Sequence, residues 1–212
     1  WSGGFGWNYA HAYGSQGSSE EEKGVRWAVR SDLDYADTTL YPRLYATLDL
    51  GFALPVEHAS IWVYSAAGAG DGNRDEALTN FYFGGFGNNY VDDNVVRRYR
   101  NYDSLPGFEI GQISARQFAR SVVEVNAPPI RFAEVGSPGF YLGEIRPAAF
   151  AGTLWSEPGT SLDATYSTIG VQFDLSFTAL HRQPMTISIG FARGFGSGGS
   201  DSSEFMLSLK IL

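Results

Sequence analysis

The 212-residue sequence contains no cysteine and no long apolar run. The absence of cysteine excludes disulfide bonds, thiolate metal sites and cysteine nucleophiles, and it leaves the redox compartment open. Because no stretch of about 18 apolar residues is present, a membrane-spanning helix is excluded as well. The first residues, WSGGFGWNYAHAYG, lack the basic and apolar segments of a signal peptide. We therefore expect either that a leader has been removed or that the chain is a piece of a longer protein.

Basic residues are scarce, at 15 Lys and Arg against 23 Asp and Glu, which gives a formal net charge of -8. A nucleic-acid partner requires a basic surface, so this composition argues against one. Three arginines nevertheless fall together in VRRYRNYDSLPG, residues 96–107, at Arg97, Arg98 and Arg100. A solvated loop is the simplest interpretation of this cluster, and it stays open at this point.

The residues that are abundant favour a β protein. Aromatic residues make up 15% of the chain, and there are 26 glycines but only 18% charged residues. This composition suits strands joined by many turns better than it suits helices. No composition shift marks a linker, so residues 1–212 are predicted to form one all-β domain.

Strict alternation of apolar and polar residues is the clearest secondary-structure signal. In residues 167–179 one face carries Ile169, Val171 and Phe173, and the other carries Gln172 and Asp174. The same period of two recurs in four more segments, at residues 24–36, 43–55, 184–195 and 204–212. Weaker strand candidates lie at residues 3–13, 59–67, 79–87, 114–127 and 140–155. Turn-rich stretches separate them, so the sequence predicts an antiparallel meander of about ten strands.

Alternation alone fits two architectures. A soluble barrel or sandwich would place the apolar face inside, whereas a membrane barrel would place it outside. The polar faces carry charges of both signs, such as Arg26, Asp32, Asp49 and Asp174, which can pair in a wet lumen. Several segments also exceed ten residues, enough to cross a bilayer at a tilt, whereas soluble strands usually have about five or six. We therefore predict a transmembrane β-barrel, with a small closed barrel and a soluble sandwich as alternatives.

The tryptophans fit the same prediction. They fall near strand ends or on faces predicted to point outward, where membrane barrels carry aromatic girdles; packing in a soluble core is the alternative. The five residues are Trp1, Trp7, Trp27, Trp62 and Trp155.

The succession of motifs after residue 79 resembles a known family. The segment FYFGGFGNNYVDDNVVRRYRNYDSLPG runs from Gly84-Gly85 into a long loop with Arg100-Asn101-Tyr102, and SVVEVNAPPIRF then places Glu124 before two prolines. IRPAAFAGTLW and three terminal strand segments follow in order. Together they resemble the C-terminal part of the outer-membrane assembly and translocation superfamily that contains BamA and TamA, also called the bacterial surface antigen family. The segments LPG, NAPPIRF and GSPGFYLGEIRPAAF are similar to sequences of one branch of this family, in which the barrel follows a propeller-like region.

The resemblance implies a fold and a site. The family's barrel has sixteen strands, so this chain would supply the last ten, and residues 88–112 would form a loop folded into the lumen. Arg97, Arg98, Arg100 and Tyr102 would anchor that loop, because guanidinium groups form strong paired hydrogen bonds with buried carboxylates. This chain departs from the family pattern at two positions. Asn101 stands where the family's loop tip, Arg-Gly-aromatic, has glycine, and Phe150 stands where the family often has an Asp. The carboxylate partner of Arg100 is therefore sought at Glu144 first, and at Glu124 or Asp174 next.

The resemblance also implies a function without bond chemistry. The chain would insert or translocate client β-barrel polypeptides at the bacterial outer membrane, in contact with outer-membrane lipid. The alternative is a passive anchor or pore that holds a soluble partner. The terminal strand would present the lipid-facing residues of an assembly signal, although the chain ends in Leu212 rather than in an aromatic residue. These residues are Phe205, Leu207, Leu209 and Ile211.

Motifs for catalysis, metals or cofactors are weak. GFGSGG, residues 194–199, has the spacing of a dinucleotide loop but lies between two strand segments, without a helix to bind a pyrophosphate. DGNRDE at 71–76 has alternate oxygen ligands, yet it lacks the glycine and the distal glutamate of a calcium loop. The pair Asp32 and Asp34 could imitate a glycosidase dyad, but lumen lining explains it better. We therefore expect no catalytic residues, no metal and no cofactor.

Overall fold

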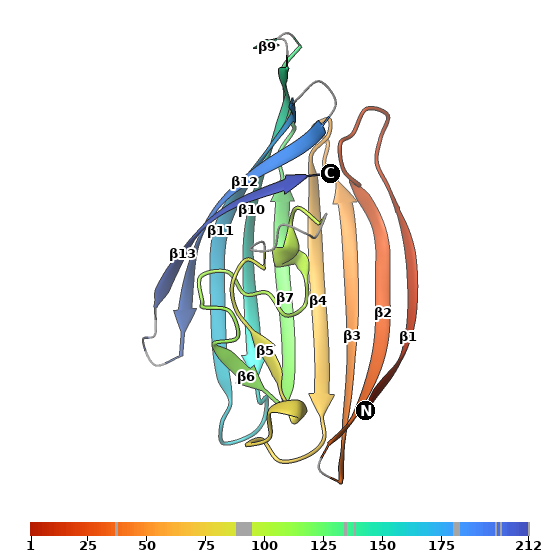
Figure 1. The fold of residues 1–212 in the computed structure, drawn as a ribbon, viewed down its shortest axis with the longest axis vertical. Helices are drawn as coiled ribbons and strands as arrows, with labels where there is room; N and C mark the ends of the chain where they lie inside the picture. Colours follow the sequence, from red (N-terminus) through yellow and green to blue (C-terminus); the bar gives the residue numbers. More distant parts are fainter. Residues whose placement is uncertain are drawn as a thin grey trace.

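The computed structural model is an all-β fold built on one large antiparallel sheet (Figure 1). It describes residues 1–36, 38–87, 95–133, 135–137, 139–179, 183–197, 199 and 201–211. The strands are β1 (Ser2–Tyr13), β2 (Lys23–Ala36), β3 (Thr39–Ala53), β4 (Ser60–Gly70), β5 (Phe81–Phe83), β6 (Ile113–Ala115), β7 (Gln117–Asn126), β8 (Ile130–Arg131), β9 (Gly136–Ser137), β10 (Phe140–Ser156), β11 (Ala164–Ala179), β12 (Gln183–Gly196) and β13 (Ser202–Ile211).

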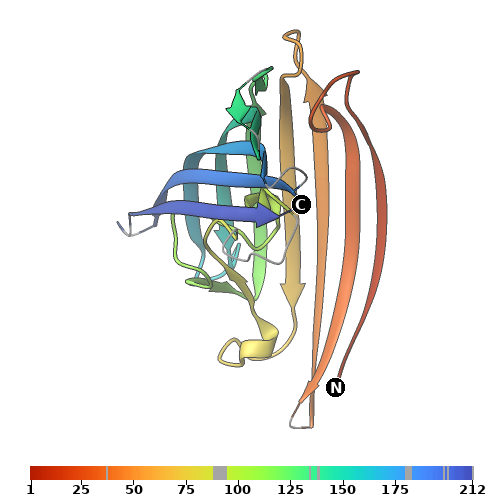
Figure 2. The same ribbon diagram turned by 45° about the horizontal axis from the view of Figure 1, so that its top comes forward.

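The main sheet follows the order β1-β2-β3-β4-β7-β10-β11-β12-β13, and the short β8 and β9 pair with β10. Figure 2 shows that this sheet curves into a trough. In the described part of the chain β1 and β13 are not paired with each other, so the sheet is open at both edges. The antiparallel all-β prediction is thus confirmed, while the sheet itself is not a closed barrel.

Two short 3-10 helices occur among the residues that the structure describes, η1 (Ala77–Thr79) and η2 (Arg98–Arg100). Within the described residues, no helix is long and apolar enough to cross a membrane.

The two faces of the sheet have opposite chemistry. On β11, Ile169 and Phe173 are 56% and 47% exposed, whereas Gln172 and Asp174 on the other face are fully buried. β13 repeats the pattern, with Phe205 and Leu207 exposed on one face and Lys210 fully buried on the other. A soluble domain would bury the apolar residues instead. In this chain, the alternation predicted from the sequence has its apolar side outward.

A long insertion covers the inner face. Strands β4 and β7 pair directly in the sheet, and the chain between them carries η1, β5, η2 and β6. Both views place these elements on the concave side of the sheet (Figures 1 and 2). Their aromatic and aliphatic side chains are buried there, including Phe83, Phe86, Tyr99 and Leu105, each at 0% exposure. The insertion therefore shares the apolar core with inward side chains of the sheet such as Trp62, Phe118 and Phe150.

Two expectations from the sequence are corrected by this arrangement. The strand expected at residues 79–87 is not part of the main sheet. Among the described strands, β5 pairs with β6 alone, inside the trough, because Phe81 and Phe83 pack on Phe118 of the main sheet, hereafter called the wall. In the described part of the chain, the main sheet consequently has nine long strands rather than ten. Trp62 is also not on an outward face, since it is 2% exposed and its ring packs beneath Arg26.

Candidate functional site

The site lies where the inward loop meets the inner face of β7, β10 and β11. Its centre is Arg97, which is only 2% exposed although it precedes a 3-10 turn in a loop. Its Nε donates to Asp174 Oδ2 at 2.6 Å, and its Nη2 donates to the carbonyl of Arg146 at 3.1 Å. Nη1 donates to the side-chain oxygen of Asn126. Arg97 thus ties the loop to three neighbouring strands, β7, β10 and β11.

Arg100 makes the second wall contact, one turn further along η2. Its Nε and Nη2 donate to the two oxygens of Glu124 at 3.0 and 2.7 Å, a forked pairing that only a guanidinium can make. Glu124 is fully buried, so it depends on this partner for its charge. The guanidinium of Arg100 also lies 5.7 Å from the ring of Tyr64.

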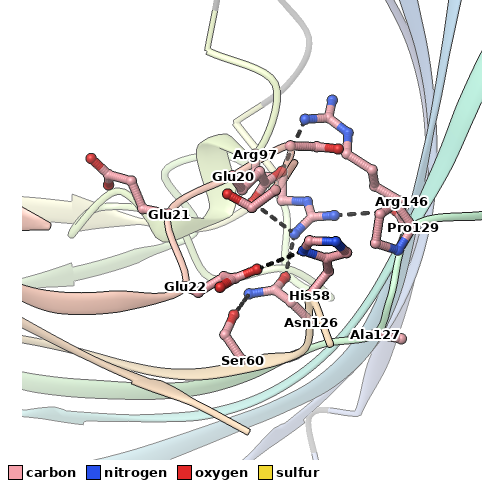
Figure 3. A pocket seen from close by; sticks show the side chains of 12 residues that line it. Glu20, Glu21, Glu22, His58, Ser60, Arg97, Asn126, Ala127, Pro129 and Arg146 are labelled. Atoms are coloured by element: carbon pink, nitrogen blue, oxygen red, sulfur yellow. Dashed lines mark hydrogen bonds and ion pairs between the residues drawn. The ribbon is translucent and has the colours of Figure 1, made fainter. Parts of the chain in front are cut away.

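The third component comes from the turn between β1 and β2. Glu20 Oε2 accepts from Arg100 Nη2 at 2.8 Å and from Arg97 Nη1 at 3.3 Å, and Glu20 Oε1 accepts from Arg146 Nη1 at 3.1 Å. One carboxylate therefore joins three arginines, two from the loop and one from β10. Figure 3 shows Glu20 beside Arg97, with Arg146 close by.

The charge of Glu20 is stabilised by these neighbours. Burial by itself raises its pKa, but the guanidinium groups of Arg100, Arg97 and Arg146 outweigh this and lower the pKa to about 2. Glu20 is therefore ionised over the whole range in which an ordinary glutamate is ionised.

The β1–β2 turn is itself tied to its neighbour. Glu22 accepts from Ser15 Oγ and from the Ser15 amide at 3.0 and 3.1 Å, and its Oε1 lies 3.0 Å from Nδ1 of His58 in the β3–β4 turn (Figure 3). These contacts hold the turn against the rim of the sheet, which places Glu20 over the arginines.

Acidification should weaken this site through Glu20. Since its pKa is about 2 when folded against an ordinary value of 4.5, its contribution to stability is present above pH 4.5 and is lost as the pH falls toward 2. We expect the melting temperature to fall over this interval less steeply in Glu20→Gln than in the parent. Thermal melts in detergent at a series of pH values measure the difference, and parallel slopes would contradict the assignment.

The inward loop has further anchors at β11, β12 and β13. Glu204 of β13 accepts from the amides of Phe86 and Gly107 at 3.2 and 3.0 Å, and Thr168 of β11 donates to the carbonyl of Pro106. Gly107 has a φ of +97° and passes so close to the wall that a Cβ would lie 2.4 Å from the amide nitrogen of Gly194. The Pro106-Gly107 pair at the end of the arginine segment is thus the place where the loop touches β12.

Two tyrosines of the loop pack beside the arginines. Tyr99 is fully buried and stacks on Phe150 at 4.4 Å, while its carbonyl accepts from the buried Arg120 at 2.8 Å. Tyr102 stacks on Tyr45 of β3 at 4.4 Å. Phe150 therefore provides a stacking surface for the loop.

The predicted partners are divided among different residues. Glu124 pairs with Arg100, as one of the two later choices anticipated, and Asp174 pairs with Arg97. The prediction that Glu144 is the first partner of Arg100 is wrong. The Glu144 oxygens lie instead near Arg131 at 3.5 Å, Arg146 at 3.7 Å and Ser19 at 2.6 Å. The reason is its position beyond the bulge between Leu142 and Glu144, where it pairs with β8 near the rim.

The remaining predicted residues lie as follows. Arg98 lines a separate hollow of the loop with Tyr82 and Asp103, and its carbonyl accepts from Ser104 Oγ at 2.9 Å. Of the predicted loop 88–112, residues 88–94 lie outside the described residues, and 95–112 lie on the concave side. The four residues of the terminal strand all face outward, with exposures between 43% and 67%: Phe205, Leu207, Leu209 and Ile211.

Sequence reasoning missed Glu20, Asn126 and Glu204. The three consecutive acids in the turn-rich stretch GSSEEEKG, residues 17–24, were the available signal for Glu20. Glu204 stands on the inner face of an alternating strand and could have been added to the lumenal acids. Among the residues that the structure describes, no group of three His, Asp or Glu could hold a metal ion.

Comparisons with protein-family models, with curated proteins and with solved structures gave no match to this chain.

Proposed function

We propose that the chain forms part of the wall of a transmembrane β-barrel in a bacterial outer membrane. The observation that supports it is the inverted distribution of side chains: exposed Ile, Val, Leu and Phe outside, and buried charged residues inside. In water, an exposed apolar face of this extent would be unfavourable, whereas a bilayer solvates it. The long strands of 10 to 17 residues are also sufficient to span a bilayer when tilted.

Within that class, we propose the assembly and translocation type. An inward loop fixed by Arg97 and Arg100 supports this, because the resemblance seen in the sequence places such a loop in that family. The outer edge of β13, which pairs with no other described strand, also supports it, since an unpaired edge offers amides and carbonyls to an incoming β segment. The chain would then guide client strands by backbone pairing, with no bond made or broken.

Depletion in the producing bacterium tests this function. If the chain assembles client barrels, its depletion should reduce the amounts of several other outer-membrane barrels severalfold, because the client strands lose the β13 edge on which they pair. Quantitative proteomics of isolated outer membranes measures this, with a lipoprotein that needs no barrel assembly as the internal control. An unchanged set of barrels would favour the alternative, a passive anchor or pore that holds a soluble partner.

A further inference from the structure

The outer face of the sheet has a groove over β10. Ala149 and Ala151 form its floor, because both are small and point outward. By register Ala151 lies between Val123 of β7 and Ile169 of β11, so larger side chains stand on each side of the alanines. The hollow has a volume of about 540 Å³ and is apolar except for one arginine. Pockets for lipid-sized or drug-sized ligands have similar volumes, roughly 300 to 1,000 Å³.

That arginine, Arg193, is unusual for its face. Between the first and last residue of each long strand, it is the only charged side chain at the described outward positions, which alternate with the inner face in register. A charge at the middle of the lipid face costs about 2 to 4 kcal/mol, and much less near the headgroups. A lone arginine on such a face is therefore expected to hold its charge at the headgroup level.

The direction of the side chain places its charge at that level. Arg193 is three residues from the end of β12; its guanidinium lies 5.3 Å from the ring of Phe195, nearer the strand end, and 3.4 Å from Asp201 in the following turn. The side chain thus extends toward the rim, as arginines do at a membrane interface. Trp155, 42% exposed, lies at the corresponding end of β10, and tryptophan marks the headgroup level in barrels.

We propose that the groove binds an acyl chain of a phosphate-bearing anionic phospholipid whose headgroup is held by Arg193. The proposal rests on the proposed function, because it requires the outer face to lie in a membrane. Charge complementarity selects the headgroup. In the described contacts, Asp201 accepts from one of the five N–H donors of the Arg193 guanidinium, and both side chains are about half exposed, so a phosphate can reach the other donors. The alanine floor selects the chain, because larger side chains there would fill the hollow.

Native mass spectrometry of the detergent-purified protein with dioleoyl phosphatidylglycerol or dioleoyl phosphatidylcholine tests the site. The parent should bind the anionic lipid more tightly, and Arg193→Gln should reduce that affinity about fivefold without changing the affinity for the zwitterionic lipid. Ala151→Phe should weaken both lipids by filling the groove, and Asp201→Asn should strengthen the anionic one. The matched control is Ala46→Phe, an exposed outward alanine on β3 that does not line the groove and should change neither affinity.

Two results would overturn the proposal, and they differ. Equal affinities in the parent, Arg193→Gln and Ala151→Phe, with brominated lipid still quenching tryptophan fluorescence, would mean a membrane protein without this site. An absence of quenching in every variant would mean that the outer face is not in lipid, so that the proposed function fails as well. Retention of the heat-sensitive electrophoretic shift in each variant shows that a loss of binding is not a loss of folding.

Discussion

Replacing Arg97 by alanine is expected to release the inward loop from the wall. The change removes the guanidinium that pairs with the fully buried Asp174. The fully buried Glu124 loses its contact with Arg97 but keeps Arg100. Removing one partner of a buried ion pair costs about 3 to 5 kcal/mol, because the other charge remains desolvated. Proteinase K should then cleave residues 95–112 of the folded protein at least about tenfold faster than in the parent. The initial rate of fragment appearance in detergent measures the effect.

The matched control is Arg193→Ala. Arg193 pairs with Asp201 at 3.4 Å on the outer face, but its side chain is 58% exposed. Such a pair contributes less than about 1 kcal/mol, so cleavage should hardly change. A loop that is cleaved equally fast in the parent and in Arg97→Ala would mean that the arginines do not hold it.

The same assay decides the partner of Arg100. A double-mutant cycle of Arg100→Ala with Glu124→Gln should show strong coupling, because the two side chains share two hydrogen bonds. The cycle with Glu144→Gln should show little coupling, since Glu144 contacts other residues.

Introducing arginine on the outer face should have the second large effect. Ile189 lies at the middle of β12, is 44% exposed, and has Phe173 and Leu207 as neighbours in register. In a membrane barrel, Ile189→Arg should destabilise the fold by about 2 to 4 kcal/mol, because the charge lies at the centre of the bilayer. A soluble domain would show almost no change at the same exposed position, so the prediction separates the two architectures.

The control is Thr165→Arg, near the beginning of β11 on the same face. Close to the interface, an arginine costs only about 0 to 1 kcal/mol. Urea titrations of the protein folded into lipid vesicles, followed by electrophoretic mobility, measure both changes. Equal stabilities of the parent and Ile189→Arg would contradict a lipid-facing position.

The sequence by itself determined the local features of this protein. A period of two in residues 167–179 can only be a strand with two unlike faces, and β11 covers that segment. Neighbouring strands joined by short turns are adjacent in the sheet, so the meander from β10 to β13 was predictable as well. The cluster at Arg97 and Arg100 by itself was compatible with a solvated loop, and buried carboxylate partners were expected only from the resemblance.

Only the tertiary structure decided which face is outside and which acid meets which arginine. Alternation is unchanged when the two faces are exchanged, so the insertion between β4 and β7, which covers the polar face, was needed to settle the question. The choice of Glu124 over Glu144 depends on strand register and on a bulge, neither of which is encoded locally. Glu20 is 80 residues from Arg100 and comes from a turn on another part of the wall. Such a contact exists only once the sheet has curved, because the curvature brings the rim turn over the loop.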